Sequence, residues 1–314
     1  MQLNKSITAK IDNVTGIHPR YLGTVIPAPI SCKIELTANC NYRCSFCVKS
    51  IRPDNGEMDR KFYSRIIREM YSYGVRELGT FFIGESFLCP WLPEAIKEAK
   101  EVGYPYVFLT TNGSAANSKK LKACMESGLD SLKFSLNFYD GNQLSQVARV
   151  SDVYFQKAID ALKEARRIRD EGGYDCGIYA SSIAFDGEQG EKMRALVEEI
   201  KPFVDEHYWL PLFSMREASE RAGMRPIVGN PGRLAKMREP LPCWSAFTEA
   251  HITKDGKLVA CCFGAGLDSN MVMADLHEVG FEVGWNSVKF QQLRESHLKK
   301  DVTGTPCESC VAAR

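Results

Sequence analysis

Cys40-Asn41-Tyr42-Arg43-Cys44-Ser45-Phe46-Cys47 places three cysteines within eight residues, shortly after the strand-like run Lys33-Ile34-Glu35-Leu36. Thiolates spaced this closely can wrap one metal centre from a single loop. Four-iron clusters are held by cysteine thiolates, usually four, so three ligands would leave one iron open. Zinc binds the same thiols, but its local signature is a pair spaced by two to four residues. The stretch therefore favours an iron–sulfur cluster with an open position.

Strand-like and helix-like segments alternate along the chain from Ser31 to about residue 213. The predicted strands are residues 31–37, 76–83, 105–110, 130–137, 176–184 and 205–213. The predicted helices are residues 59–73, 91–102, 116–127, 152–170 and 188–200. Such alternation predicts a buried parallel sheet in an α/β fold. Six strand–helix units are too few for a closed eight-stranded barrel.

The spacing Cys-x-x-x-Cys-x-x-Cys, with an aromatic residue before the last cysteine, resembles the cluster loop of radical S-adenosylmethionine (SAM) enzymes. The resemblance implies a partial (β/α)6 TIM-like barrel over residues 31–234, after an irregular N-terminal extension at 1–30. It implies a [4Fe-4S] cluster on Cys40, Cys44 and Cys47, whose open iron chelates SAM. In that family, electron transfer from the cluster cleaves SAM to a 5′-deoxyadenosyl radical.

The same resemblance implies a set of SAM-binding residues. Gly84-Glu85 matches part of a Gly-Gly-Glu-Pro-like motif that holds the methionine ammonium, although Ile83 and Ser86 replace its second glycine and its proline. The alternative there is a helix N-cap at Ser86. The other candidates are Asn112 after the third strand, Ser135 and Asn137 on one face of the fourth, Arg149 for the SAM carboxylate, Tyr42 as a shield for the cluster and Phe46 as an adenine contact. An ordinary turn at Asn112-Gly113 and a solvated Arg149 are the alternatives for those two.

Cys243, Cys261, Cys307 and Cys310 form a second set of thiols beyond the predicted barrel. A hairpin signal at Asp255-Gly256 and a predicted helix at about 285–298 separate them. The pattern resembles the first half of a SPASM domain, in the truncated form called Twitch. It implies an auxiliary [4Fe-4S] cluster in a small α+β domain at 235–314. A zinc ribbon would use the same four thiols.

Cys262 follows Cys261 directly and has three possible roles: an alternative cluster ligand, a hydrogen donor to a substrate radical, or a buried small hydrophobe. One auxiliary cluster in one subdomain resembles the dehydrogenases of 2-deoxy-scyllo-inosamine, and the same layout with a spare cysteine near the cluster resembles the epimerases of neomycin C. That resemblance implies dehydrogenation or epimerisation of a small polar substrate, such as an aminocyclitol, amino sugar or nucleoside sugar. A reducing partner such as flavodoxin or ferredoxin is expected. Peptide modification and a non-catalytic Fe–S or zinc scaffold are the rival hypotheses.

The composition fits these expectations. Forty basic and 39 acidic residues give a net charge of +1, which offers no reason to expect nucleic acid or a membrane surface as partner. Among the 12 cysteines, the clustered spacings favour metal binding over disulfides. No signal peptide or transmembrane run is evident. We therefore expect a cytoplasmic protein.

Overall fold

The computed structural model describes residues 6–50, 54–185, 187–210, 241–261 and 269–308. In these residues the strands form one nine-stranded sheet in the order β6-β5-β4-β3-β2-β1-β7-β8-β9. The strands are β1 (Ser31–Ile34), β2 (Glu77–Gly79), β3 (Tyr106–Thr111), β4 (Ser131–Ser135), β5 (Gly177–Ile183), β6 (Glu206–Leu210), β7 (Glu249–Ile252), β8 (Lys257–Val259) and β9 (Val272–Asp275). The prediction of a parallel sheet is confirmed, because β1 to β6 pair in parallel, each with the next.

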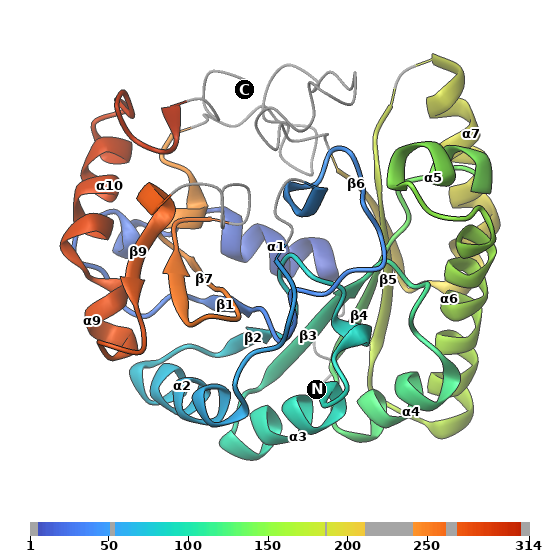
Figure 1. Ribbon diagram of the computed structural model, residues 1–314, viewed down its shortest axis with the longest axis horizontal. Coiled ribbons are helices and arrows are strands. Elements are labelled where there is room, and N and C mark those ends of the chain that lie inside the picture. Colours follow the sequence, from blue (N-terminus) through green and yellow to red (C-terminus); the bar gives the residue numbers. More distant parts are fainter. Residues whose placement is uncertain (1–5, 51–53, 186, 211–240, 262–268, 309–314) are drawn as a thin grey trace.

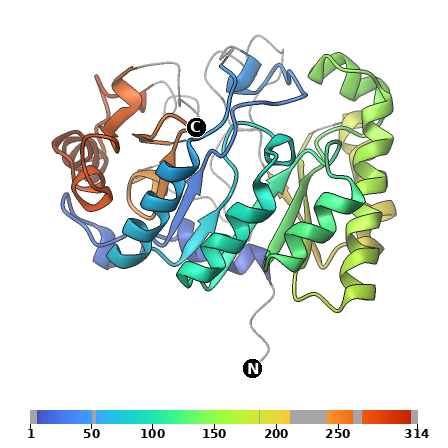
Figure 2. The ribbon, with the colours of Figure 1, turned by 60° about the horizontal axis from the view of Figure 1, so that its bottom comes forward.

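Helices cover the outer side of this curved sheet (Figure 1). They are α2 (Arg60–Tyr73), α3 (Leu92–Val102), α4 (Ser118–Glu126), α6 (Val153–Gly172) and α7 (Gly187–Ile200). Figure 2 shows α2, α3 and α4 side by side in front of the strands. This α/β arrangement is consistent with the partial barrel that the sequence predicts.

The two faces of strand β3 differ in burial. On β3, Val107 and Leu109 are buried in the main hydrophobic core, whereas Tyr106, Phe108 and Thr110 are only half-buried on the other face. Successive residues of a strand point to opposite faces, so a period of two exists although the sequence does not show it clearly. The outer face of β3 packs in the main hydrophobic core, and its inner face carries the less buried side chains.

The N-terminal segment is not irregular, and this expectation was wrong. Helix α1 (Ile7–Thr15) begins after Ser6, whose hydroxyl accepts from the amide of Ala9, and lies inside the arc of strands (Figure 1). Glu206 on β6 accepts a hydrogen bond from the amide of Ile7 at 2.9 Å. The ammonium of Lys10 lies 3.8 Å from the centre of the Tyr106 ring. The helix forms because the sheet offers a surface for it, which local sequence does not reveal.

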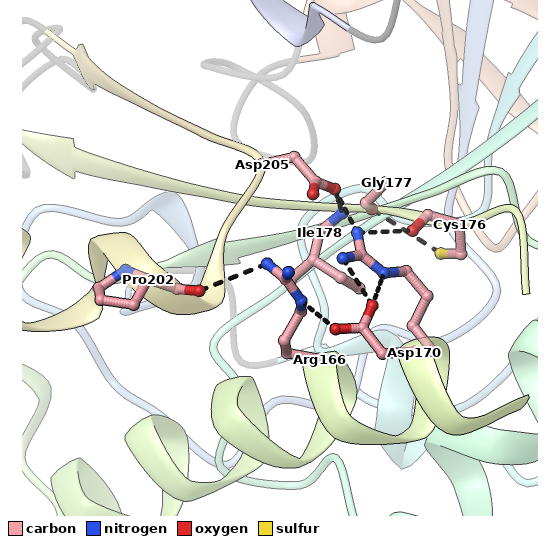
Figure 3. Close-up of polar contacts among 8 residues, drawn as sticks. Arg166, Asp170, Cys176, Gly177, Ile178, Pro202 and Asp205 are labelled. Carbon is pink, nitrogen blue, oxygen red and sulfur yellow. Dashed lines mark hydrogen bonds and ion pairs between the residues drawn. The ribbon is translucent and has the colours of Figure 1, made fainter. Parts of the chain in front are cut away.

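Polar contacts fasten β5 and β6 to the end of α6 at the edge where these strands begin (Figure 3). Asp205 accepts from the amide of Ile178 at 2.8 Å and from Arg169 at 2.5 Å. Arg166 pairs with Asp170 one turn along the helix. Cationic side chains in the last turns of α6 also suit the negative end of its dipole.

The C-terminal segment extends the sheet of the barrel. Strand β7 pairs in parallel with β1, and β7 and β8 form the antiparallel hairpin expected around Asp255-Gly256. The helix expected at about 285–298 is present as α10 (Val288–Leu298), which begins after the N-cap Ser287, and the short helix α9 (Phe281–Trp285) precedes it. No described helix is long and apolar enough to cross a membrane.

A buried arginine joins the parts of this C-terminal segment. Arg294 on α10 is 0% exposed and donates to the carbonyls of Ala246, Trp285 and Thr24 at 2.8 to 3.0 Å. Burial lowers the pKa of its guanidinium to about 9. The three carbonyls belong to three different stretches of the chain, and the Arg294 side chain holds these stretches together.

Candidate cofactor and substrate site

The three clustered cysteines lie on the loop that follows β1. Cys40, Cys44 and Cys47 are half-buried, and their thiols are close enough to influence one another electrostatically. Burial raises the pKa of Cys40 to about 12 and also raises the pKa of the other two thiols. Thiols in such surroundings become thiolates only when a cation compensates their charge, which is what iron supplies. No three His, Cys, Asp or Glu side chains in the described ranges are already drawn together around one metal ion.

Helix α5 (Gly141–Ala148), which the sequence did not predict, holds this loop. The amides of Arg43 and Ser45 donate to the carbonyls of Ala148 and Val147 at 2.8 and 3.0 Å. The last carbonyls of a helix have no partner within the helix, so the loop satisfies them. The available signal was Asp140, whose carboxylate caps the helix by accepting from the amide of Gln143.

Aromatic side chains of the loop pack on the same region. The rings of Tyr42 and Tyr154 pack edge to face, with 6.2 Å between their centres. The centres of the Phe46 and Phe138 rings are 6.3 Å apart. Tyr42 is buried, and Cys40 and Cys44 pack against the same small apolar cluster. Arg149 ends α5 in the left-handed region with φ 55°, and its side chain is exposed.

Gly84 lies where two loops nearly touch. A Cβ added there would lie 2.0 Å from the carbonyl oxygen of Thr37 and 2.9 Å from that of Asn39. The next amide, Glu85, donates to the Asn39 carbonyl at 2.8 Å. The glycine therefore lets the loop after β2 bond directly to the residue before Cys40.

The Glu85 side chain accepts hydrogen bonds from other residues of the protein. Its carboxylate is buried and accepts from the hydroxyl of Thr111 at 2.7 Å and from the amides of Asn112 and Phe87 at 2.8 and 3.1 Å. Burial raises its pKa, while these three donors favour the charged form. In the described contacts the side chain joins the end of β3 to the 3-10 helix η3 (Ser86–Leu88). Its predicted contact with the methionine ammonium stays a prediction.

Asparagines complete a network at this edge of the sheet. The Asn112 side chain donates to Asn41 at 3.0 Å, and Asn41 donates to Ser114 at 2.8 Å. Asn41 follows Cys40, so the end of β3 is bonded to the thiol loop. At the end of β4, Ser135 and Asn137 are half-buried, and Asn137 Oδ1 has no hydrogen-bond partner among the described residues. A buried acceptor without a donor is costly, so this oxygen fits a bound polar ligand.

These observations fit the [4Fe-4S] cluster and SAM that the sequence implies. A loop with three thiols, a close approach permitted by Gly84 and an unpartnered acceptor at Asn137 meet at the edge where the parallel strands end. The carboxyl edge of a parallel sheet is where α/β proteins place their ligands.

The second set of thiols is partly described. Cys243, Cys261 and Cys307 are half-buried, whereas the expected ligand Cys310 and the candidate hydrogen donor Cys262 lie outside the described residues. The amide of Cys243 donates to Nδ1 of His297 at 3.0 Å. Cys261 follows β8, and both Cys261 and Cys307 pack against the main core.

The inner face of the sheet also holds a charged group that the sequence analysis missed. The Lys33 ammonium lies 2.6 Å from Glu249 Oε2, and Nε2 of His251 lies 2.9 Å from the same oxygen. We call Lys33, Glu249 and His251 the inner triad. Burial opposes ionisation of Glu249, but the Lys33 ammonium and His251 outweigh it and hold its pKa at about 2. The available signal was the polar residue at every second position of the two strands.

Comparison with protein families gives two matches. The model of the radical SAM superfamily matches residues 34–200, which is more than half of the chain. The model of an iron–sulfur cluster-binding domain, SPASM, matches residues 243–311.

Curated relatives match about half of the chain. A GTP 3′,8-cyclase of Chlorobaculum tepidum is 28% identical over an alignment of 193 residues that covers 56% of this chain and 55% of that protein. For a SAM-dependent nucleotide dehydratase of Flammeovirga pacifica, the identity is 26% over an alignment of 184 residues that covers 55% of this chain and 59% of that protein. For a PqqA peptide cyclase of Methylorubrum populi, the identity is 29% over an alignment of 150 residues that covers 47% of this chain and 38% of that protein. The match spans less than two thirds of each relative.

Solved structures share the fold. BtrN in complex with AdoMet and 2-DOIA aligns with a TM-score of 0.53 and 17% identity, covering 86% of this chain and 87% of that one. Streptococcus suis SuiB bound to S-adenosylmethionine aligns with a TM-score of 0.65 and 15% identity, covering 91% and 71%.

Proposed function

Because the chain belongs to the radical SAM superfamily and carries a SPASM domain, we propose that it abstracts a hydrogen atom from a small polar substrate and completes a dehydrogenation or an epimerisation. The radical SAM domain implies a [4Fe-4S] cluster and SAM, and the SPASM domain implies auxiliary iron–sulfur clusters. When bound, the first cluster and SAM supply a 5′-deoxyadenosyl radical. The aminocyclitols, amino sugars and nucleoside sugars are the substrate classes that we propose.

One observation carries the first half of this proposal. The thiol loop, the Gly84-Glu85 loop and the end of β3 are bonded to one another through Glu85, Asn112 and Asn41. In our proposal Cys40, Cys44 and Cys47 hold the SAM-binding cluster. Gly84 and Glu85 shape the methionine site, and Asn112, Ser135, Asn137 and Arg149 take the remaining polar groups of SAM. Tyr42 shields the cluster and Phe46 contacts the adenine.

The second half concerns the C-terminal thiols. We propose that Cys243, Cys261, Cys307 and Cys310 hold a single auxiliary [4Fe-4S] cluster in a Twitch-like domain at 235–314. Cys262 is the proposed hydrogen donor if the product is an epimer. A dehydrogenase would need no such donor, because its product carries a carbonyl group in place of the alcohol. A reducing partner such as flavodoxin or ferredoxin would supply electrons.

Peptide modification is the second candidate. One sequence relative is named a PqqA peptide cyclase, and a SuiB structure bound to its precursor peptide SuiA has a TM-score of 0.65 with this chain. Two other relatives are named for GTP and nucleotide substrates, which are small and polar. The charged inner face of the sheet supports the small polar substrate.

The test is SAM cleavage after anaerobic reconstitution with iron and sulfide. We expect about eight iron atoms per chain and release of 5′-deoxyadenosine with a strong reductant. Replacing Cys40, Cys44 and Cys47 together by Ala should abolish release and remove about half of the iron. Cys124→Ala is the matched control, because Cys124 is a buried cysteine of α4 in the main core. A fully loaded protein that releases no 5′-deoxyadenosine would support the non-catalytic scaffold instead.

The product then distinguishes the two outcomes. With solvent D2O and a converted substrate, an epimerase incorporates deuterium at the inverted carbon, and Cys262→Ala stops conversion without stopping SAM cleavage. A dehydrogenase gives a ketone without solvent label at that carbon. Conversion of a peptide but of no small polyol would favour the second candidate.

A further inference from the structure

The inner triad occupies the concave face of the sheet. Lys33 and His251 are direct neighbours in the parallel pairing of β1 with β7, and Glu249 precedes His251 by two residues on the same face. The residues between them face the other way, into the main core: Cys32, Ile34, Ala250 and Ile252. The triad therefore points to the side of the sheet on which α1 lies (Figure 1).

The triad also lies between the two proposed cofactor loops. The ring of Phe82, two residues before Gly84, lies 5.5 Å from the ring of His251. On the other side, the ring of Trp244, which follows Cys243, lies 5.7 Å from the Lys33 ammonium. The triad is therefore in contact with a residue next to each of the two proposed cofactor loops.

His251 has hydrogen-bonding capacity that the protein does not use. The side chain is 0% exposed, and neither ring nitrogen makes a hydrogen bond of ordinary geometry with a described residue. The nearest acceptor is Glu249, 2.9 Å from Nε2, and it is ionised. A neutral imidazole carries one proton, and this carboxylate favours it on Nε2. Nδ1 is then a buried lone pair, which is costly without a donor.

We propose that Nδ1 of His251 is a substrate-binding acceptor for a hydroxyl or amino group inside the barrel. The Glu249 carboxylate, next to Nε2, holds the ring in the tautomer with its proton on Nε2. The Lys33 ammonium keeps Glu249 ionised. The ligand class is a polyol or amino-polyol, because those molecules present the donors that Nδ1 lacks. This inference deepens the proposed function and rests on it. A role confined to internal charge balance would leave Nδ1 no reason to be buried without a partner.

The first test is independent of any substrate. The chain has five histidines, so 15N-histidine NMR of the reconstituted protein, assigned with His251→Asn, can identify the tautomer at this position. We expect a neutral ring with the proton on Nε2 and a free Nδ1. Burial, which lowers the pKa of His251, agrees with the neutral form. A proton on Nδ1, or a doubly protonated ring at pH 7.5, overturns the proposal.

The second test compares two substitutions. His251→Asn keeps an acceptor near the position of Nδ1, whereas His251→Gln places its amide near Nε2. With SAM bound, we would titrate 2-deoxystreptamine, glucosamine and adenosine into each protein. The best ligand of the unaltered protein should keep its affinity within about threefold in the Asn variant and lose about tenfold in the Gln variant. His207→Gln is the control, because His207 pairs with Ala180 on the opposite face and bonds to Ser182.

The outcomes separate this inference from the proposed function. Equal affinity in the Asn and Gln variants overturns the role of Nδ1, and so does failure of all three ligands to bind the unaltered protein. The His207→Gln control should still release 5′-deoxyadenosine without substrate, because His207 lies beside the core residue Ala180 on the opposite face of the sheet. If the unaltered protein releases none, the proposed function fails, whereas the NMR result still decides the tautomer. Thermal melting of each variant confirms that it is folded.

Discussion

Replacing Gly84 by Ala tests whether the close approach of two loops builds the SAM site. The added Cβ would lie 2.0 Å from the carbonyl oxygen of Thr37, and ordinary contact begins near 3.4 Å. The loops must therefore separate by about 1.4 Å, since both partners are backbone atoms that cannot rotate away. The hydrogen bond from Glu85 to Asn39, now 2.8 Å, would be lost at that separation.

The expected magnitude follows from these two effects. Overpacking costs about 1–3 kcal/mol, and the lost hydrogen bond adds about 1 kcal/mol. We expect the free energy of unfolding to fall by about 2–4 kcal/mol, measured by anaerobic urea unfolding. Because Asn39 precedes Cys40, the first of the proposed thiol ligands, SAM-dependent release of 5′-deoxyadenosine should fall at least about tenfold.

Gly280→Ala is the matched control for this substitution. Its Cβ would meet only Glu69, at 3.7 Å, and its backbone is not in the left-handed region. Gly280 is the N-cap of α9, where Ala is less favourable than Gly by roughly 1 kcal/mol, so this control should lose less stability than Gly84→Ala and keep the activity of the unaltered protein. If Gly84→Ala behaves like Gly280→Ala in both assays, the close approach does not shape the site and the reasoning is refuted.

Three further predictions concern stability. Burial raises the pKa of Glu77 to about 7, so the unaltered protein loses stability as the pH rises from about 4.5 to 7, and Glu77→Gln should be more stable at pH 8 by up to about 3 kcal/mol. Urea unfolding at pH 4 and pH 8 checks this, and an equal difference at both values would contradict it. Arg294→Met should lower the free energy of unfolding by about 3–5 kcal/mol, because three carbonyls lose their buried donor. The control is Lys289→Met on the same helix, where the side chain is exposed, and it should change the free energy of unfolding by less than about 0.5 kcal/mol. Asp205→Asn should lower the free energy of unfolding by about 1–2 kcal/mol, because Asp205 accepts from the amide of Ile178. Asp170→Asn should lower it by less, since the Asp170 side chain is 49% exposed. If thermal melting shows a larger loss for Asp170→Asn, the contacts in Figure 3 do not hold β5 and β6 to α6 as we infer.

Local patterns carried most of the architecture. The described strands β1 to β5 and the helices α2, α3, α4, α6 and α7 fall where spacing and turn residues predict them. The short helix α5 was missed, since eight residues give little periodicity and its stability comes from the thiol loop packed on it. Helix α1 was missed for the same physical reason, because the inner face of the sheet stabilises it.

The sequence by itself determined what depends on neighbours along the chain. Three thiols within one loop, and strands that alternate with helices, are local facts that point to a cluster-binding partial barrel. Only the tertiary structure decided what depends on distant residues. Lys33 meets Glu249 across 216 positions, and Glu85 meets Asn112 across 27. No local spacing encodes such pairs, because the register of the parallel strands brings them together and the pattern of one strand does not name its partner.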